Sequence, residues 1–147
     1  MTTTRTRAGA AIRVLSIAAL TVCSIATVLA ADWPVFKPGN WTFERTMSGT
    51  HSTPDKASNT RCSDPTAERH ARQAMLQRPG CQVTPLTQNG QTYRFSATCR
   101  SGPMTTKSDY ILEASSAEAY TLRVDSTTDG RRTFDMLHAR RVGDCAR

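Results

Sequence analysis

The sequence predicts a mainly β protein, in which six antiparallel strands form one meander, as a curved sheet or an open barrel, with a single short helix. Three observations lead to this fold class. Apolar and polar residues alternate along several segments, turn-forming residues separate these segments, and helix signals occur in only one place, near residues 63–80. Four cysteines after residue 31 predict that disulfide bonds stabilise the sheet.

Residues 1–30 are predicted to be a signal peptide that is removed on export. Residues 1–13 contain no acidic residue and three arginines: Arg5, Arg7 and Arg13. An apolar run from Val14 to Ala31 follows them. Small residues precede the expected cleavage site between Ala30 and Ala31, and hydroxyl residues dilute the apolar run. The alternative is an uncleaved N-terminal membrane anchor, because a run of this length is at the lower limit for a span.

Cleavage would leave residues 31–147 as one exported β domain, for which we expect a location in the periplasm. Loss of the three arginines lowers the net charge from +7 to +4, so the mature chain is only mildly basic. Cys23 leaves with the signal, and an even number of cysteines remains: Cys62, Cys81, Cys99 and Cys145. In an exported chain this pattern indicates two disulfides.

Residues 32–39 contain two prolines and are expected to form an extended lead-in. Residues 40–48 place three apolar side chains on one face, which predicts a half-buried strand: Trp41, Phe43 and Met47. Residues 49–60 are polar and rich in turn-forming residues, so we expect a flexible loop there.

The helix is expected to begin at Ser63 or Asp64, either of which can cap it, with Pro65 in the first turn and Glu68 near the positive end. Pro79-Gly80 would end it. One stripe recurs at helical spacing and is predicted to pack over the sheet: Ala67, Ala71, Ala74, Met75 and Arg78.

The remaining strands are expected over residues 81–87, 92–100, 104–114, 119–127 and 132–142. Asp129-Gly130 is a strong signal for a hairpin turn before the last strand. Within these strands the alternating residues expected on buried faces are Tyr110 and Leu112, then Tyr120, Leu122 and Val124, then Phe134, Met136 and His138.

The register of the hairpin that opens at Cys81 bears on the disulfides. A two-residue turn at Asn89-Gly90 would turn Cys81 and Cys99 to opposite faces. The apolar residues of both strands are odd-numbered, so burying all of them requires a three-residue loop or a bulge, for which Pro85 is a plausible position. Cys81 and Cys99 then share a face.

We therefore favour the disulfides Cys81–Cys99 and Cys62–Cys145, although four cysteines allow three pairings and sequence alone does not choose among them. A zinc or redox site is not expected, because the chain has no Cys-x-x-Cys and structural zinc ligands usually come in close pairs. We expect no metal, no cofactor and no catalytic residue.

Several short segments, taken in order, resemble one family of exported bacterial proteins, grouped as domain of unknown function 3617. They are KPGNW at 37–41, CSDP at 62–65, CQVT at 81–84, YRF at 93–95 before Cys99, GPMT at 102–105 and RRVGDC at 140–145. The resemblance implies an envelope location in Gram-negative bacteria and a mostly antiparallel β fold. It supplies no catalytic residues.

The function favoured by these observations is that of a non-catalytic envelope module that binds a protein partner or a small apolar ligand. A curved sheet crossed by one helix can enclose a modest cavity. Candidate lining residues are Trp41, Phe43, Tyr93, Phe95, Tyr120, Leu122 and Phe134, although the simpler interpretation is that they fill the core.

Two other functions are weaker hypotheses. A periplasmic hydrolase or lyase could use His138 or His70 with a carboxylate, but no nucleophile motif is present, and His138 shares its expected face with Phe134 and Met136, as a core histidine would. An arginine-rich surface at Arg131-Arg132 and Arg140-Arg141 could dock an anionic envelope polymer. Nucleic-acid binding is not expected because stacking aromatics are few, and no membrane span is expected after cleavage.

The export hypothesis can be checked by mass spectrometry of the protein recovered from the periplasm of a Gram-negative host. We expect a chain that begins at Ala31 and has no titratable thiol. Ala30→Arg should block cleavage, because a long charged residue replaces a small one at the recognised position. A chain that keeps residues 1–30 would support the membrane anchor instead.

Overall fold

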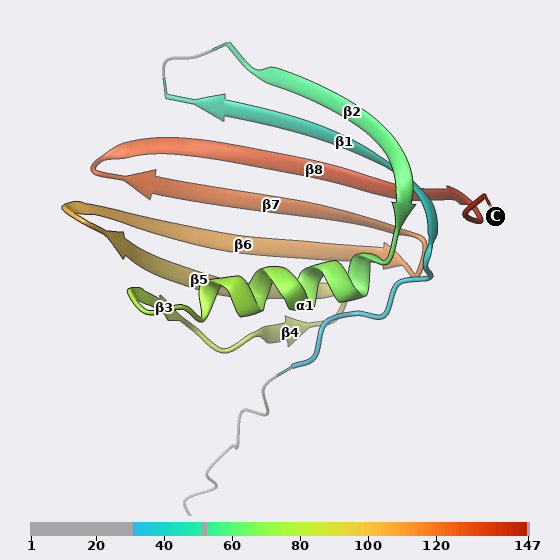
Figure 1. Ribbon diagram of the computed structural model, residues 1–147, viewed down its shortest axis with the longest axis horizontal. Coiled ribbons are helices and arrows are strands. Elements are labelled where there is room, and N and C mark those ends of the chain that lie inside the picture. The colour runs from blue at the N-terminus through green and yellow to red at the C-terminus, as the bar shows by residue number, and fades with distance from the viewer. Residues whose placement is uncertain (1–30, 51–52, 147) are drawn as a thin grey trace, which may run out of the picture.

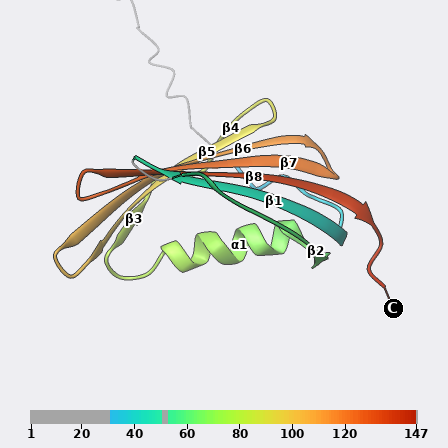
Figure 2. The same ribbon diagram turned by 90° about the horizontal axis from the view of Figure 1, so that it is seen from above.

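Eight antiparallel strands form one curved sheet, and a single helix lies against the face toward which the sheet bends (Figure 1, Figure 2). The computed structural model describes residues 31–50 and 53–146, so the predicted signal peptide and its cleavage site lie outside or at the edge of the described residues. The elements are β1 (Gly39–Gly49), β2 (Asp55–Ser63), α1 (Pro65–Leu76), β3 (Cys81–Val83), β4 (Thr87–Asn89), β5 (Thr92–Ser101), β6 (Met104–Ser116), β7 (Ala119–Thr128) and β8 (Arg131–Gly143).

The prediction of a mainly β chain with one helix is confirmed, but the sheet has eight strands rather than six. One additional strand is β2, which occupies the second half of the segment expected to be a loop and pairs with β1 along its whole length. All of its residues except Ser63 are exposed. A strand at the edge of a sheet needs no apolar alternation. The polar sequence of β2 therefore lacks the pattern from which a strand is predicted.

The other additional strand arises where the segment expected as one strand is interrupted at residues 84–86, between β3 and β4. Cys81 of β3 pairs with Cys99 of β5, and Asn89 of β4 pairs with Thr92 of β5. The register against β5 therefore shifts by one residue across the interruption. The predicted ladder defect at Pro85 is therefore present. The turn lies at Gly90-Gln91 rather than at Asn89-Gly90, and Gly90 has the positive φ of 60° that this turn requires.

The strand order is β2-β1-β8-β7-β6-β5-β3, with β4 also paired to β5. Strands β5 to β8 follow one another as the predicted meander, and the β7–β8 hairpin turns at Asp129-Gly130, where both residues have positive φ. The first strand departs from a meander, because β1 pairs with the last strand, β8. The alternation of apolar and polar residues indicates which face of a strand is buried, but it does not indicate which other strands pair with it.

The core lies between the sheet and the segments that cross it. Trp41 and Tyr120 are almost completely buried, with ring centroids 5.8 Å apart. Phe36 completes this cluster at 4.7 Å from Tyr120. The segment before β1 therefore contributes to the core and is more than a lead-in, and it is tied to the helix because the Phe36 backbone N–H donates to Thr66 Oγ1 at 2.8 Å.

The helix begins as predicted but ends at Leu76, before the predicted stop at Pro79-Gly80, and the predicted packing face is wrong. Asp64 Oδ1 accepts a hydrogen bond from the Ala67 backbone N–H at 3.1 Å, and Pro65 opens the first turn. The residues of the expected stripe are all exposed: Ala67, Ala71, Ala74, Met75 and Arg78. The buried helix residues are Pro65 and Arg69, so a charged side chain takes the place expected for alanines.

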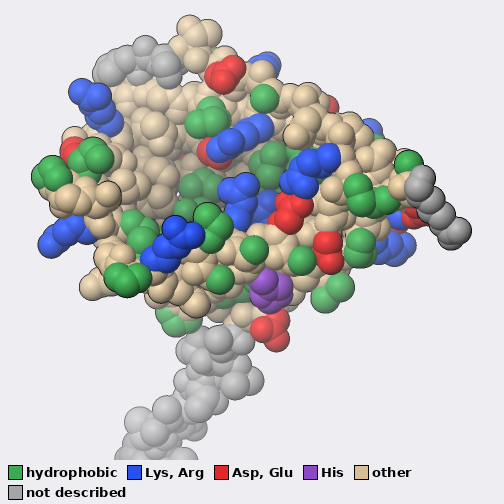
Figure 3. Space-filling view, in the orientation of Figure 1, with side chains coloured by type: hydrophobic (Ala, Val, Ile, Leu, Met, Phe, Trp, Pro, Cys, Tyr) green, Lys and Arg blue, Asp and Glu red, His purple; other side chains and the backbone are tan. Residues whose placement is uncertain are grey.

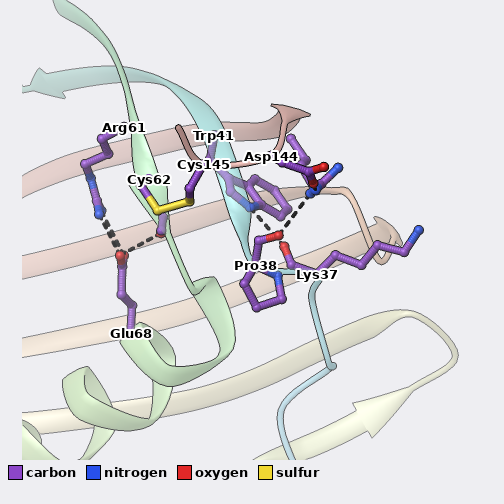
Figure 4. The surroundings of a disulfide bond; sticks show 10 residues. Lys37, Pro38, Trp41, Arg61, Cys62, Glu68, Asp144 and Cys145 are labelled. Atoms are coloured by element: carbon purple, nitrogen blue, oxygen red, sulfur yellow. Dashed lines mark hydrogen bonds and ion pairs between the residues drawn. A yellow bond between two sulfur atoms is a disulfide. The ribbon is translucent and has the colours of Figure 1, made fainter. Parts of the chain in front are cut away.

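The four cysteines lie in two pairs at disulfide distance, in the pairing favoured by the hairpin argument. Cys62 of β2 and Cys145 after β8 have Cα atoms 5.4 Å apart, and Cys81 of β3 and Cys99 of β5 have Cα atoms 4.0 Å apart. Figure 4 shows that the first pair joins the chain just before the helix to the C-terminal segment. The second pair joins the chain just after the helix to the sheet.

The two disulfides should differ in their contributions to stability. The Cys62–Cys145 loop spans 83 residues and the Cys81–Cys99 loop 18, so the chain-entropy model assigns them about 4–5 and about 3 kcal/mol respectively. Urea unfolding of the two double-alanine variants, Cys62→Ala with Cys145→Ala and Cys81→Ala with Cys99→Ala, should rank them in this order. A larger loss from the shorter loop would contradict the entropic explanation.

Candidate ligand-binding cleft

A cleft of about 440 Å³ lies between α1 and the sheet. Figure 3 shows hydrophobic side chains in the depth of this hollow, with charged side chains of both signs around it. The apolar lining residues are Trp33, Phe43, Ala57, Met75, Leu76, Phe95, Tyr110, Leu122, Val124 and Leu137. The charged ones are Arg45, Arg61, Glu68, Arg69, Arg72 and Asp135.

The floor of the cleft comes from the central strands. Leu122 of β7 faces Leu137 of β8, and Val124 of β7 faces Tyr110 of β6. Leu122 is buried, but Val124, Leu137 and Tyr110 are only partly buried. These apolar side chains point toward the helix without being fully covered by it, which leaves an open apolar surface.

Stacked aromatic rings form one wall. The rings of Phe95 and Tyr110 are parallel, with centroids 4.3 Å apart, and Trp33 meets Phe95 edge to face at 5.8 Å. Trp33 Nε1 also donates to Gln73 Oε1 of the helix at 2.7 Å. This hydrogen bond links the helix to the wall and satisfies the polar atom of a buried indole.

Arg45 and Asp135 form an ion pair across β1 and β8. Arg45 Nε donates to Asp135 Oδ1 at 2.8 Å, and Nη2 donates to Oδ2 at 2.5 Å. The hydrogen bonds to Asp135 raise the pKa of Arg45. Two parallel hydrogen bonds fix the geometry of this pair more firmly than a single contact would.

A second ion pair joins β2 to the helix. Arg61 Nη1 and Nη2 donate to Glu68 Oε1 and Oε2 at 2.6 and 2.9 Å, and Ser63 Oγ donates to Oε1 at 2.6 Å (Figure 4). The hydrogen bonds from Arg61 lower the pKa of Glu68, burial opposes this, and Ser63 adds to the lowering. Both carboxylate oxygens of Glu68 are therefore occupied.

Arg69 differs from the other arginines of the cleft, because it is only 5% exposed and makes no ion pair with any described residue. Nη2 donates to the Tyr120 hydroxyl at 3.0 Å, and the guanidinium carbon lies 5.2 Å from the centre of the Tyr120 ring. Nε is buried and has no hydrogen-bond partner in the part of the chain that the structure describes. Burial raises the pKa of Tyr120, and the Arg69 charge opposes this.

The predicted lining residues fall into three groups. Phe43, Phe95 and Leu122 line the cleft, and Trp41, Tyr93 and Tyr120 fill the core. Phe134 was assigned to the wrong face. Its neighbour Asp135 faces the cleft, so Phe134 lies on the opposite side of β8, where Arg123 and Arg132 lie over its ring at 5.9 and 5.4 Å.

His138 shares that outer face with Phe134 and is exposed, so its expected role as a core histidine is wrong. Nδ1 lies 3.2 Å from Thr121 Oγ1. Its neighbour across the strands is Glu44, but among the described residues no carboxylate hydrogen-bonds to His138. His70 lies exposed on the helix.

The arginines of the cleft were missed by sequence analysis. Arg69 and Arg72 both lie on α1 and line the cleft, but helical spacing assigned the alanines to the packed face. The available signal was the spacing of Pro65, Arg69, Gln73 and Leu76 by three and four residues. This spacing predicts the packed face of the helix only if a charged residue is accepted as buried.

The family model described as "Protein of unknown function (DUF3617)" matches residues 36–145. The chain belongs to this family. The match includes every strand, the helix and all four cysteines of the DUF3617 domain, whereas Trp33 of the cleft wall precedes it. No curated protein and no solved structure matches the chain.

Within residues 31–50 and 53–146, no cluster of histidine, cysteine and acidic side chains is arranged to hold a metal ion. Over the same residues, no helix has the length and apolar character to cross a membrane.

The Arg61–Glu68 pair should make stability depend on pH. Because the pKa of Glu68 is lowered in the folded state, the pair stabilises above the ordinary glutamate pKa of about 4.3, and this contribution is lost as the pH falls below it. Denaturant unfolding should show Glu68→Gln to be less stable than wild type at neutral pH, by about 0.5–1 kcal/mol. The difference should shrink as the pH falls below about 4.3 and disappear at a lower pH, where Glu68 is protonated in the folded state as well.

Glu113→Gln provides the matched control, because Glu113 is exposed and forms no ion pair with a described residue. We expect it to leave the unfolding free energy unchanged at both pH values. A Glu68→Gln effect that persisted at the lower pH would contradict an electrostatic origin.

Proposed function

We propose that this protein is a non-catalytic binding module of the cell envelope and that the cleft beside α1 holds a small apolar ligand. The observation that carries the proposal is the open apolar floor of Val124, Leu137 and Tyr110 in a cleft of about 440 Å³. Ligand sites are typically concave, mostly apolar and of roughly 300–1,000 Å³. Protein interiors that are simply filled have few voids larger than a water molecule.

An envelope location is part of the same proposal. Two cysteine pairs at disulfide distance suit an oxidising compartment such as the periplasm. The basic and apolar N-terminal segment is typical of an export signal. A module that is exported in this way meets apolar envelope molecules that need shielding from water.

We prefer binding to hydrolase activity and to docking of an anionic polymer, because the residues that these two functions need are not suitably arranged. A hydrolase would need a base oriented by a carboxylate, and His138 instead contacts Thr121 on the outer face. Docking of an anionic polymer would need clustered arginines, but Arg131-Arg132 and Arg140-Arg141 lie at opposite ends of β8. Of these arginines, Arg141 is already paired with Glu118 and Asp144.

The proposal can be tested with the neutral dye N-phenyl-1-naphthylamine, whose fluorescence rises in apolar surroundings. We expect saturable binding to the wild-type protein. Leu137→Trp places a larger side chain into the open volume and should weaken dye binding by about tenfold, which corresponds to roughly 1.4 kcal/mol.

Met136→Trp is the matched control, because Met136 is the adjacent residue of β8, is also half-buried and points to the opposite face. It should bind the dye as the wild type does. Absence of dye binding, or equal weakening by both substitutions, would refute a ligand site in the cleft.

A further inference from the structure

The charges of the cleft point to the class of ligand. We propose that the ligand is a single-chain amphiphile with a carboxylate head group, that Arg69 and Arg72 bind the head group, and that the apolar floor holds the chain. This inference rests on the proposed binding function and adds the chemistry of the molecule that is bound.

Arg69 supplies the first argument. A guanidinium has five N–H donors and is always charged, yet among the described residues this side chain makes one hydrogen bond, from Nη2 to the neutral Tyr120 hydroxyl. Charged side chains that are this deeply buried are normally paired with an opposite charge. Glu68 lies close enough for its charge to be felt by Arg69, but no carboxylate among the described residues accepts a hydrogen bond from Arg69, so the site can accept an anion.

The two carboxylates that line the cleft with Arg69 are already occupied. Glu68 accepts hydrogen bonds from Arg61 and Ser63, and Asp135 accepts two from Arg45. Four arginines and two carboxylates line the cleft, so the lining carries a net charge of +2. Two of the four arginines form these ion pairs, and the excess positive charge therefore belongs to Arg69 and Arg72.

Arg72 lies three residues after Arg69, so the two side chains project from the same side of the helix. Both line the cleft. Arg72 is exposed and makes no hydrogen bond or ion pair within the described part of the chain. It is therefore free to move toward an anion that binds beside Arg69, and a pair of guanidinium groups suits the planar oxygens of a carboxylate.

The volume of the cleft limits the size of the chain. At roughly 30 Å³ for each water-sized group, a cleft of about 440 Å³ holds on the order of 15 non-hydrogen atoms. This is the size of a saturated carboxylate with about twelve carbons, and a lipid with two long chains would exceed it. The charged residues of α1 and the apolar floor thus match the two ends of one small amphiphile.

The test compares dodecanoate with dodecan-1-ol, which has the same chain without the charge. Both are added to protein that has bound N-phenyl-1-naphthylamine, at neutral pH, where a carboxylate is ionised. We expect dodecanoate to displace the dye from the wild-type protein at a concentration about tenfold lower than dodecan-1-ol. In Arg69→Met this preference should disappear, since hydrogen bonds to a charged group typically contribute such a factor.

Arg72→Gln is the second variant, and because Arg72 is exposed its result does not depend on core packing. It should reduce the preference by about threefold, as expected for a partly solvated charge. Arg123→Met, on the outer face of β7, removes an arginine of similar exposure to Arg72 and should leave the preference unchanged.

The possible outcomes separate the two proposals. Equal displacement by dodecanoate and dodecan-1-ol, or a preference that survives in both Arg69→Met and Arg72→Gln, would overturn the assignment of an anionic ligand and leave the apolar site intact. If the dye binds and neither chain displaces it, the ligand class is wrong. If the dye does not bind to the wild-type protein, the proposed function fails, and this inference fails with it.

Discussion

The pairing of β1 with β8 is the contact on which the rest of the structure depends. It joins the first strand of the sheet to the last, and because β2 pairs with the other edge of β1, this one ladder adds two strands to the meander of β5–β8. The same ladder sets Arg45 beside Asp135 and turns Trp41 and Phe43 toward the helix. Without it, the strand that leads into α1 would have no place on the sheet, and the cleft would lose one side.

The helix runs between β2 and β3 (Figure 1) and is restrained at both ends. The cleft lies beside the stretch between these ends. Before α1, the Cys62–Cys145 pair and the Arg61–Glu68 ion pair hold β2 to the C-terminal segment and to the first turn (Figure 4). After α1, the Cys81–Cys99 pair holds the chain to β5. Restraints at the two ends oppose both detachment of the helix and its collapse onto the sheet, so the apolar floor stays accessible.

The charged residues of the cleft divide into two kinds. Arg45 and Arg61 each have a carboxylate, and their two-point hydrogen bonds help to position the strands and the helix. Arg69 hydrogen-bonds to Tyr120 and to no carboxylate among residues 31–50 and 53–146, and such an arrangement is unfavourable for the isolated protein. Buried charges of this kind tend to occur at functional sites. A sequence pattern that assumes an apolar helix face therefore does not predict that Arg69 is buried.

The local features could be predicted from the residues alone: the strands with alternating residues, the helix that starts at Asp64-Pro65, and the turn at Asp129-Gly130. These depend on neighbours within a few residues along the chain. Only the tertiary structure decided that β1 pairs with β8, that polar β2 is a strand and that Leu137 rather than Phe134 faces the cleft. Strand β8 has apolar residues on both faces, so the buried face is selected by partners distant in sequence, whose packing no local pattern records.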